Sequence, residues 1–568
     1  MAETLISPGV LARENDQSFI TQQPVTVGAA IIGPTVKGPY QIPTVVTTYS
    51  DYLNKFGGSF LSGGQEYSYF TQIAAYNYFQ QGGQSLLIAR VASGSWASAT
   101  GSILAINTSA SFTLKTISEG TIMNSVGPTG SNGTLDSGST DNIRWQITNV
   151  DTGSGQFSLL IRQGNDTTTE PIVLETWTNL SLDPTQDNYI ARVIGDSYQT
   201  YDSVENYVKV VGSFPNNSRY VYVSTVANPT PFYFDNNGVA KAAFTPYMPA
   251  TASGAFGGGL GDLYYASGPA LYYSASNGTT NLQGINATDY NEMITLMSNQ
   301  DDYRFNVISV PGLTLQDNTA QTTALVNVVQ SRGDAIAVLD PSPYDAKITQ
   351  VITDASAVNS SYAAAYWPWL QTIDPGTGQL VWVPASTMIP AVYAFTDSVS
   401  EPWFAPAGIN RGGLDTVVRA ERKLSQTNRN DLYTGNINPI ATFPGTGVVV
   451  YGQKTLQKKA SALDRVNVRR LLIALKSYIS QVANNLVFEQ NTIATRNRFL
   501  NIVNPYLEQV RANQGLYAFR VIMDETNNTP DLIDMNIMYG QIFLQPTRTA
   551  EFIILDFNIQ PTGASFPE

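Results

Sequence analysis

The sequence predicts a multidomain protein of mixed α/β and α+β class. Apolar strands alternate with helices in two separated stretches, a region rich in Gly, Ser, Thr and Asn lies between those stretches, and two long helices precede the last strands. A chain of 568 residues is long enough for about two to four domains. We therefore expect a discontinuous α/β core, an inserted β-rich domain and a C-terminal α+β domain, with an arm at each end that exchanges strands.

The α/β core is expected from residues 25–92 and 283–436. Its first piece has the order strand, helix, strand and ends in the apolar run SLLIARVA at 85–92. Residues 307–341 repeat this order, with the apolar runs VISVPG and DAIAVLDP on either side of a helix at 322–332. Apolar strands connected by helices are typical of a sheet that is buried on both faces. The pattern therefore predicts one α/β unit that is split in sequence.

Residues 93–282 separate the two pieces of this core. They hold many turn-forming residues and short runs of alternating polarity, among them ASFTLKTI, IRWQITNV, FSLLIRQ and YVYVSTV. Short alternating strands between turns favour either a β-sandwich or a β-barrel. We expect an inserted β-rich domain that faces outward.

The C-terminal α+β domain is expected at residues 437–551. From Val468 onward, apolar residues recur at alternating spacings of four and three, which predicts an amphipathic helix. These apolar residues are Leu472, Leu475, Ile479, Val482 and Leu486. A second helix is predicted from Thr492 to Asn513, with Gly515 as its C-terminal cap. Pro505 should either kink that helix or begin a new one.

Three strand-like runs follow the second helix, at 516–523, 538–544 and 552–559. In the last run apolar residues alternate with a period of two, which is typical of a strand. An apolar strand at the end of a chain needs a partner, so we interpret residues 552–568 as a C-terminal arm. Residues 1–24 are interpreted as an extended N-terminal arm, with a disordered terminus as the alternative.

The two arms give the first set of candidate site residues. Pro8 and Gly9 argue against a helix in the N-terminal arm. The residues that we predict to form strands between subunits are Pro8, Gly9, Val10, Leu11, Ile553, Leu555, Phe557 and Ile559. Such strands would add to the sheet of a neighbouring subunit.

Basic residues are concentrated in one segment of an otherwise acidic chain. Between Arg411 and Lys476 there are 12 Lys and Arg against 4 Asp and Glu, a net charge of +8 inside a chain of −13. The densest part comprises Lys454, Lys458, Lys459, Arg465, Arg469, Arg470 and Lys476. This segment predicts either a binding face for an acidic partner or a solvated basic surface without a partner.

The composition excludes several kinds of chemistry. The chain has no Cys and no His, which rules out disulfides, thiol catalysis and a Ser-His-Asp triad. Neither a Walker A loop nor a G-x-S-x-G motif is present. The carboxylate pairs Asp340 with Asp345 and Glu170 with Glu175 are weak candidates for a glycosidase. We therefore expect no enzymatic activity, no cofactor and no metal.

The charge and the apolar runs also limit the partners. A net charge of −13 argues against direct nucleic-acid binding. The chain contains no run of 18 apolar residues, so no membrane insertion is predicted, and the first residues lack the features of a secretory signal.

Several blocks of sequence resemble contractile tail sheath proteins, which occur in contractile phage tails, pyocin-like particles and type VI secretion machines. The C-terminal blocks are NVRRLL, VFEQN, GLYAFRVIMDETNNTP and IFLQPTRTAEFIIL, and they stand in the family order. Residues 366–386, 401–412 and 437–456 are similar to further sheath signatures, and SPGV at 7–10 resembles the N-terminal arm. Leu11 departs from the aromatic residue that often follows SPGV in the family.

The resemblance implies a structural subunit that forms a helical tube around an inner tail tube and contracts by rearrangement of subunits. It implies neighbouring copies, the tail tube protein, and baseplate and tail terminator proteins as partners, in a virion tail assembled in the host cytoplasm. It further implies that some of the basic residues contact an acidic tube surface. A static β-rich virion component, such as a baseplate or capsid-type protein, is the alternative.

Overall fold

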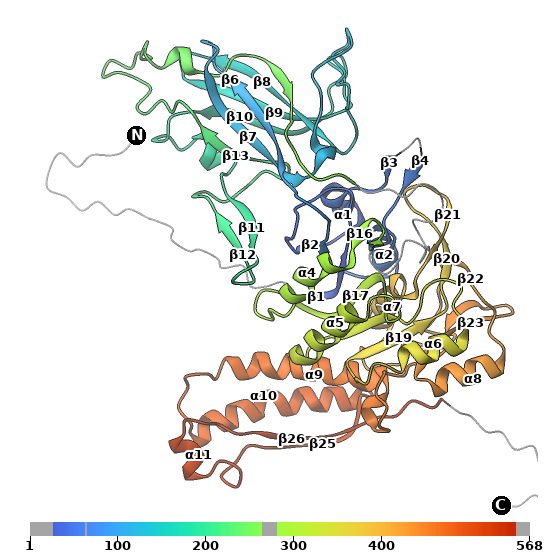
Figure 1. Ribbon diagram of the computed structural model, residues 1–568. Helices are drawn as coiled ribbons and strands as arrows, with labels where there is room; N and C mark the ends of the chain where they lie inside the picture. Colours follow the sequence, from blue (N-terminus) through green and yellow to red (C-terminus); the bar gives the residue numbers. More distant parts are fainter. Residues whose placement is uncertain (1–25, 63–64, 264–280, 552–568) are drawn as a thin grey trace, which may run out of the picture.

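The computed structural model describes residues 26–62, 65–263 and 281–551 (Figure 1). An eight-stranded sheet forms its centre, and the six strands from β5 to β23 run parallel to one another. In spatial order the strands are β2 (Thr44–Val46), β5 (Leu86–Arg90), β1 (Thr26–Gly33), β17 (Arg304–Thr314), β18 (Ile336–Asp340), β19 (Ala363–Trp367), β23 (Ile437–Phe443) and β24 (Gly447–Val450). Because β1 pairs with β17, the two distant stretches of the chain build one sheet, as the sequence predicted.

Helices cover both faces of this sheet. Alternate strand residues point to opposite faces, so Ile31 lies in one hydrophobic cluster and Ile32 in the other. One face packs against α1 (Tyr49–Phe56), α2 (Phe70–Gln80) and α7 (Ile389–Val399); the other packs against α4 (Tyr290–Leu296), α5 (Thr319–Arg332), α6 (Ile348–Ala355) and α8 (Gln426–Thr434). Burial on both faces explains the continuous apolar runs of the central strands.

The region between the two pieces of the core forms two antiparallel sheets that share one hydrophobic cluster. One sheet contains β10 (Val173–Ser181), β9 (Gln156–Gln163), β8 (Ile143–Asp151) and β14 (Ser253–Ala255); the other contains β13 (Val221–Val226), β7 (Ala110–Glu119) and β6 (Ser98–Leu104). Phe112 on β7 stacks on Phe157 on β9 with ring centroids 5.7 Å apart. The two sheets pack face to face as in a sandwich, and residues 249–260, which pair with both β8 and β6, join them along one edge.

Smaller elements connect these layers. The hairpin of β11 and β12 extends from the sandwich to the core, where the Asn206 amide lies 3.4 Å from the Thr295 carbonyl of α4. The smaller strands and the short helix outside the C-terminal region are β3 (Phe60–Ser62), β4 (Gln65–Tyr67), α3 (Ile190–Val193), β11 (Tyr198–Asp202), β12 (Tyr207–Val211), β15 (Asn281–Leu282), β16 (Ile285–Asn286), β20 (Leu370–Ile373), β21 (Leu380–Val383) and β22 (Val417–Ala420).

The C-terminal region contains a helical hairpin packed on a β-hairpin (Figure 1). It comprises α9 (Val466–Asn484), α10 (Ile493–Ala512), β25 (Leu516–Ile522), α11 (Pro530–Asp534) and β26 (Gln541–Pro546). Helix α10 runs without a break through Pro505, so the prediction that a new helix begins there is wrong.

The cap predicted at Gly515 is also wrong. The left-handed backbone conformation falls on Gln514, with φ of 63°. Gly515 is required for a different reason, because a Cβ there would lie 2.7 Å from Val510 Cγ1. Strand β26 begins three residues later than predicted, since Tyr539 is instead hydrogen-bonded to Asn528 in the preceding loop.

Candidate assembly site

The hairpin of β25 and β26 has one covered face and two open edges. Phe519 pairs with Leu544 and Val521 with Ile542, and all four side chains pack toward α10. On the other face Phe543 is 54% exposed. Within the described ranges, neither strand pairs with a third strand. Unpaired strand edges present rows of backbone donors and acceptors, so this sheet can accept further strands.

Glu551 lies directly before the predicted C-terminal arm and is held by three side chains. Arg465 donates to both carboxylate oxygens, from Nε at 2.7 Å and from Nη2 at 3.0 Å. The Tyr433 hydroxyl donates at 2.7 Å and the Gln453 amide at 3.1 Å. Partial burial opposes ionisation, but these hydrogen bonds outweigh it and lower the pKa of Glu551. The carboxylate therefore fastens the end of the described chain to α8 and to the start of α9.

The predicted arm residues themselves lie outside the described residues. This applies to Pro8, Gly9, Val10 and Leu11 and equally to Ile553, Leu555, Phe557 and Ile559. Their pairing with neighbouring subunits stays a prediction. No sequence pattern predicted the Glu551 contacts, because its partners precede it by 86 to 118 residues in the chain.

Three of the seven basic candidates have exposed side chains. These are Lys458, Lys459 and Lys476. Lys476 also lies 3.2 Å from the Tyr362 hydroxyl. Lys454 is half-buried and donates to the Tyr433 carbonyl at 2.7 Å.

The arginines of the set make contacts within the subunit. Arg469 is 3% exposed, donates to the Ser361 carbonyl at 3.2 Å and lies over the Tyr362 ring. Arg470 is also 3% exposed and forms an ion pair with Asp397 at 2.6 Å. The structure does not support a surface role for these two residues. Both arginines were selected by the local density of positive charge, which could not show that this side of α9 packs against the core.

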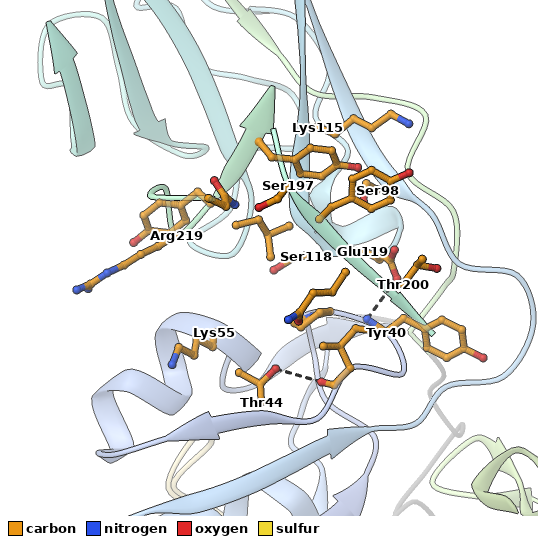
Figure 2. Close-up of a pocket in the computed structure, with 18 of the residues that line it drawn as sticks. Tyr40, Thr44, Lys55, Ser98, Lys115, Ser118, Glu119, Ser197, Thr200 and Arg219 are labelled. Atoms are coloured by element: carbon orange, nitrogen blue, oxygen red, sulfur yellow. Dashed lines mark hydrogen bonds between the residues drawn. The ribbon is translucent and has the colours of Figure 1, made fainter. Parts of the chain in front are cut away.

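A cleft of about 1050 Å³ lies between the sandwich and the core (Figure 2). Figure 2 shows Thr44 and Lys55 on the core side and Lys115 on the sandwich side. Glu119 accepts from the Tyr40 backbone N–H at 3.2 Å, and Lys37 pairs with Asp141 across the boundary at 3.2 Å. These contacts join the two layers. They do not place a nucleophilic side chain next to a general base.

The carboxylate pairs considered for a glycosidase do not form a catalytic site either. Asp340 is buried, and its carboxylate accepts from the Ser386 N–H at 2.9 Å, whereas the Asp345 side chain is 81% exposed. Glu175 accepts from the Ser218 hydroxyl at 2.6 Å. Among the residues that the structure describes, no group of three or more acidic side chains is arranged to hold a metal. Within these same residues, no helix is both long and apolar enough to span a membrane.

Comparison with known proteins identifies the class of this fold. Residues 283–456 match the phage tail sheath protein central domain, and residues 458–560 match the phage tail sheath C-terminal domain. A crystal structure of a sheath tail protein from Listeria innocua is similar in fold, with a TM-score of 0.53 and 10% identity over 92% of this chain and 96% of that chain.

Two curated relatives are tail sheath proteins. That of Vibrio phage KVP40 is 34% identical over 354 residues, which is 59% of this chain and 51% of the relative. That of Enterobacteria phage T4 is 38% identical over 211 residues, which is 37% of this chain and 32% of the relative. The chain spans about half the length of the first relative and about a third of the second. The chain is therefore similar to phage tail sheath proteins over residues 283–560.

Proposed function

We propose that this chain is a structural subunit of a contractile tail sheath. The subunits polymerise as a helical tube around an inner tail tube, and the tube contracts to drive the inner tube through a target envelope. The observation that carries this proposal is the succession of two sheath domains, of which the second ends in a hairpin with open strand edges. A structural, non-catalytic role accords with this family.

Each domain has its own role in this proposal. Residues 25–92 and 283–456 serve as the α/β core, 93–282 as the outward-facing domain, and 458–551 as the domain nearest the tube. The boundary expected at 436 is moved, because β23 and β24 belong to the core sheet and the matches to the central and C-terminal sheath domains meet between 456 and 458.

Strand exchange links the subunits in this proposal. The N-terminal arm of one neighbour and the C-terminal arm of another add to the open edges of β25 and β26. Each added backbone hydrogen bond stabilises by only about 0.5–1.5 kcal/mol, but several per strand hold neighbours together. Glu551 fixes the root of the C-terminal arm to its own subunit, so pulling on the arm transmits force to α8 and α9.

The free energy for contraction comes from new contacts between subunits. The extended sheath is metastable, and its subunits rotate and repack into a shorter, wider arrangement with more contacts. The exposed Lys458, Lys459 and Lys476 contact an acidic tube surface. Exposed ion pairs contribute about 0.2–1 kcal/mol each, so they can position the sheath on the tube and still break when it slides.

The partners are further copies of this chain, the tail tube protein, and baseplate and tail terminator proteins. The site of action is the virion tail, which is assembled in the host cytoplasm. A static baseplate or capsid-type component is the less favoured alternative, because both matching domains are sheath domains.

Electron microscopy of the purified, overexpressed chain tests the proposal. We expect long striated tubes of uniform width, and the same tubes around added tail tube protein. Closed shells or flat rings would support the static alternative. Monomers that stay monomers with tube and baseplate proteins present would overturn the proposed function.

A further inference from the structure

Exposed apolar side chains gather at the tip of the C-terminal region, where the α9–α10 loop lies beside α11 (Figure 1). The Asn491 side-chain amide donates to the Ile537 carbonyl at 3.0 Å and joins the two segments. We call the exposed side chains Val487, Phe488, Ile493, Met535 and Ile537 the tip patch. Each is at least 43% exposed, and Phe488 is fully exposed. A cluster of this kind on a folded surface marks an interaction site.

Phe488 is not needed for the fold of the loop. Its φ is 70°, in the left-handed region that glycine and asparagine adopt more easily than a bulky residue. Its fully exposed ring covers nothing in the described chain. A bulky residue with a left-handed backbone and an exposed apolar ring is unfavourable in the isolated subunit, and a contact outside the subunit explains its presence.

The tip patch is held rigidly. Asn528 is 2% exposed, and its side chain donates to the Asp524 carbonyl at 3.0 Å and to the Tyr539 carbonyl at 2.8 Å. The Tyr539 N–H donates back to Asn528 at 2.8 Å. Because these bonds fix the loop that carries Met535 and Ile537, the patch loses little conformational entropy on binding.

The α11 side of the tip patch is acidic, whereas Arg498 is exposed on the α10 side. Residues 524–539 contain four acidic side chains, at Asp524, Glu525, Asp531 and Asp534, and no basic ones. Glu489 adds a further negative charge next to Phe488. The partner must therefore present apolar side chains beside positive charge.

Such a surface exists on the same chain, on the three-stranded sheet of β21, β20 and β22. Ile373, Leu380 and Val418 are 54%, 55% and 53% exposed there. Arg419 and Lys423 are exposed beside them, within the segment 411–476 of net charge +8. We call these five residues the basic sheet. Figure 1 shows the basic sheet and α11 on opposite sides of the molecule.

We propose that the tip patch of one copy docks on the basic sheet of a second copy. The two surfaces are matched in both charge and apolar character, and their positions on opposite sides prevent contact within one subunit. A contact between two different surfaces repeats from copy to copy, and it builds a ring where the rotation closes and an open helical assembly where it does not. The inference rests on the proposed sheath function and names a side-chain interface in addition to the strand exchange.

The first test is Phe488→Asn, which suits the left-handed backbone and should leave thermal unfolding unchanged. We expect at least a tenfold rise in the protein concentration needed to form tubes, measured by sedimentation and electron microscopy without tube protein. The matched control is Val204→Asn, which changes a side chain that is 87% exposed on the β11–β12 hairpin. It should assemble like the wild type.

Charge exchange is the second test. Asp531→Lys with Asp534→Lys, and separately Arg419→Glu with Lys423→Glu, should each weaken assembly, whereas the combined variant should recover most of it. Recovery requires that the two surfaces meet, and a loss of folding cannot produce it. Thermal unfolding of each variant checks that the subunit is intact.

The outcomes separate this inference from the proposed function. Wild-type tubes together with normal tubes of Phe488→Asn would overturn the inference and leave the sheath function standing. Normal tube-free assembly of that variant with a loss of binding to tube protein would place the tip patch on the inner tube instead. A wild type that never assembles, with or without tube protein, would overturn both.

Discussion

The eight-stranded core sheet and the β25–β26 hairpin differ in how their edges end. Strands β18 and β19 are buried at every position, and the outer edge of β24 is covered by the segment before β22. There, Gly408 donates to Val450, Val450 donates to Gly412, and Leu414 donates to Val448. In the described chain the hairpin has no comparable cover at either edge.

Because of this difference, the core sheet mainly affects folding of the subunit and the hairpin mainly affects assembly. The core sheet has a covered edge at β24 and buries both faces, so a single subunit can keep it stable. A two-stranded hairpin is only marginally stable by itself and depends here on α10 for one face. Strands donated by other subunits would complete the hairpin, and changes there should affect the polymer more than the monomer.

Removal of residues 552–568 should have the largest effect on assembly. We expect no tubes from this truncated chain by electron microscopy, because one open edge of a neighbouring hairpin would lack its strand. The monomer should unfold at the wild-type temperature, since the core sheet does not depend on the arm. Deletion of residues 1–20 should give the same pair of results. Normal tubes from either truncation would refute strand exchange.

A cavity made in the core sheet should destabilise the monomer more than a cavity made in the hairpin. Ile336 is 0% exposed on β18, and Ile336→Ala should reduce the free energy of unfolding by about 2–5 kcal/mol. Ile542 on β26 is only partly buried, so Ile542→Ala should cost less, about 1–2 kcal/mol. Urea unfolding measures both. An equal or larger cost at Ile542 would contradict the comparison.

The sequence predicted the core better than the assembly site. Continuous apolar runs such as Leu86–Arg90 gave correct strands, because burial on both faces leaves a clear pattern. The periodicity of α9 was equally clear, but it could not show that Arg469 and Arg470 are buried against the core. The Glu551 contacts depend on tertiary packing between α8, α9 and the chain end, which local patterns do not encode.

The pH dependence of stability should identify a carboxyl group sealed in the core. Burial raises the pKa of Asp340 to about 7, against the hydrogen bonds from Ser386. Because the folded pKa of Asp340 exceeds that of the unfolded chain, this residue costs no stability below the unfolded pKa and lowers stability progressively as the pH rises to about 7. We expect Asp340 to lower the free energy of unfolding by about 2–3 kcal/mol between pH 5 and 8.

Asp340→Asn isolates this contribution. The variant should lose less stability than the wild type between pH 5 and 8, as measured by urea unfolding at several pH values. Asp302→Asn, at an exposed position, is the matched control and should follow the wild type. An Asp340→Asn profile parallel to that of the wild type would show that the carboxyl group ionises freely in the folded protein.

Glu551→Gln should have a small effect on the monomer and a clear but partial effect on the polymer. The lowered pKa of Glu551 means that its contribution is complete above 4.5, the ordinary carboxyl pKa, and is lost as the pH falls through the folded value. After allowance for solvent screening, we expect a cost of about 1 kcal/mol at pH 7 that disappears in acid. Glu508→Gln removes the exposed ion pair with Arg511 and serves as the control.

If Glu551 holds the root of the arm, tubes of Glu551→Gln should form but break under lower load than control tubes, because the root of each arm is then held less firmly to its own subunit. Equal tube strength would mean that force passes between subunits without loading this contact, and that the open hairpin edges alone determine how the sheath holds together.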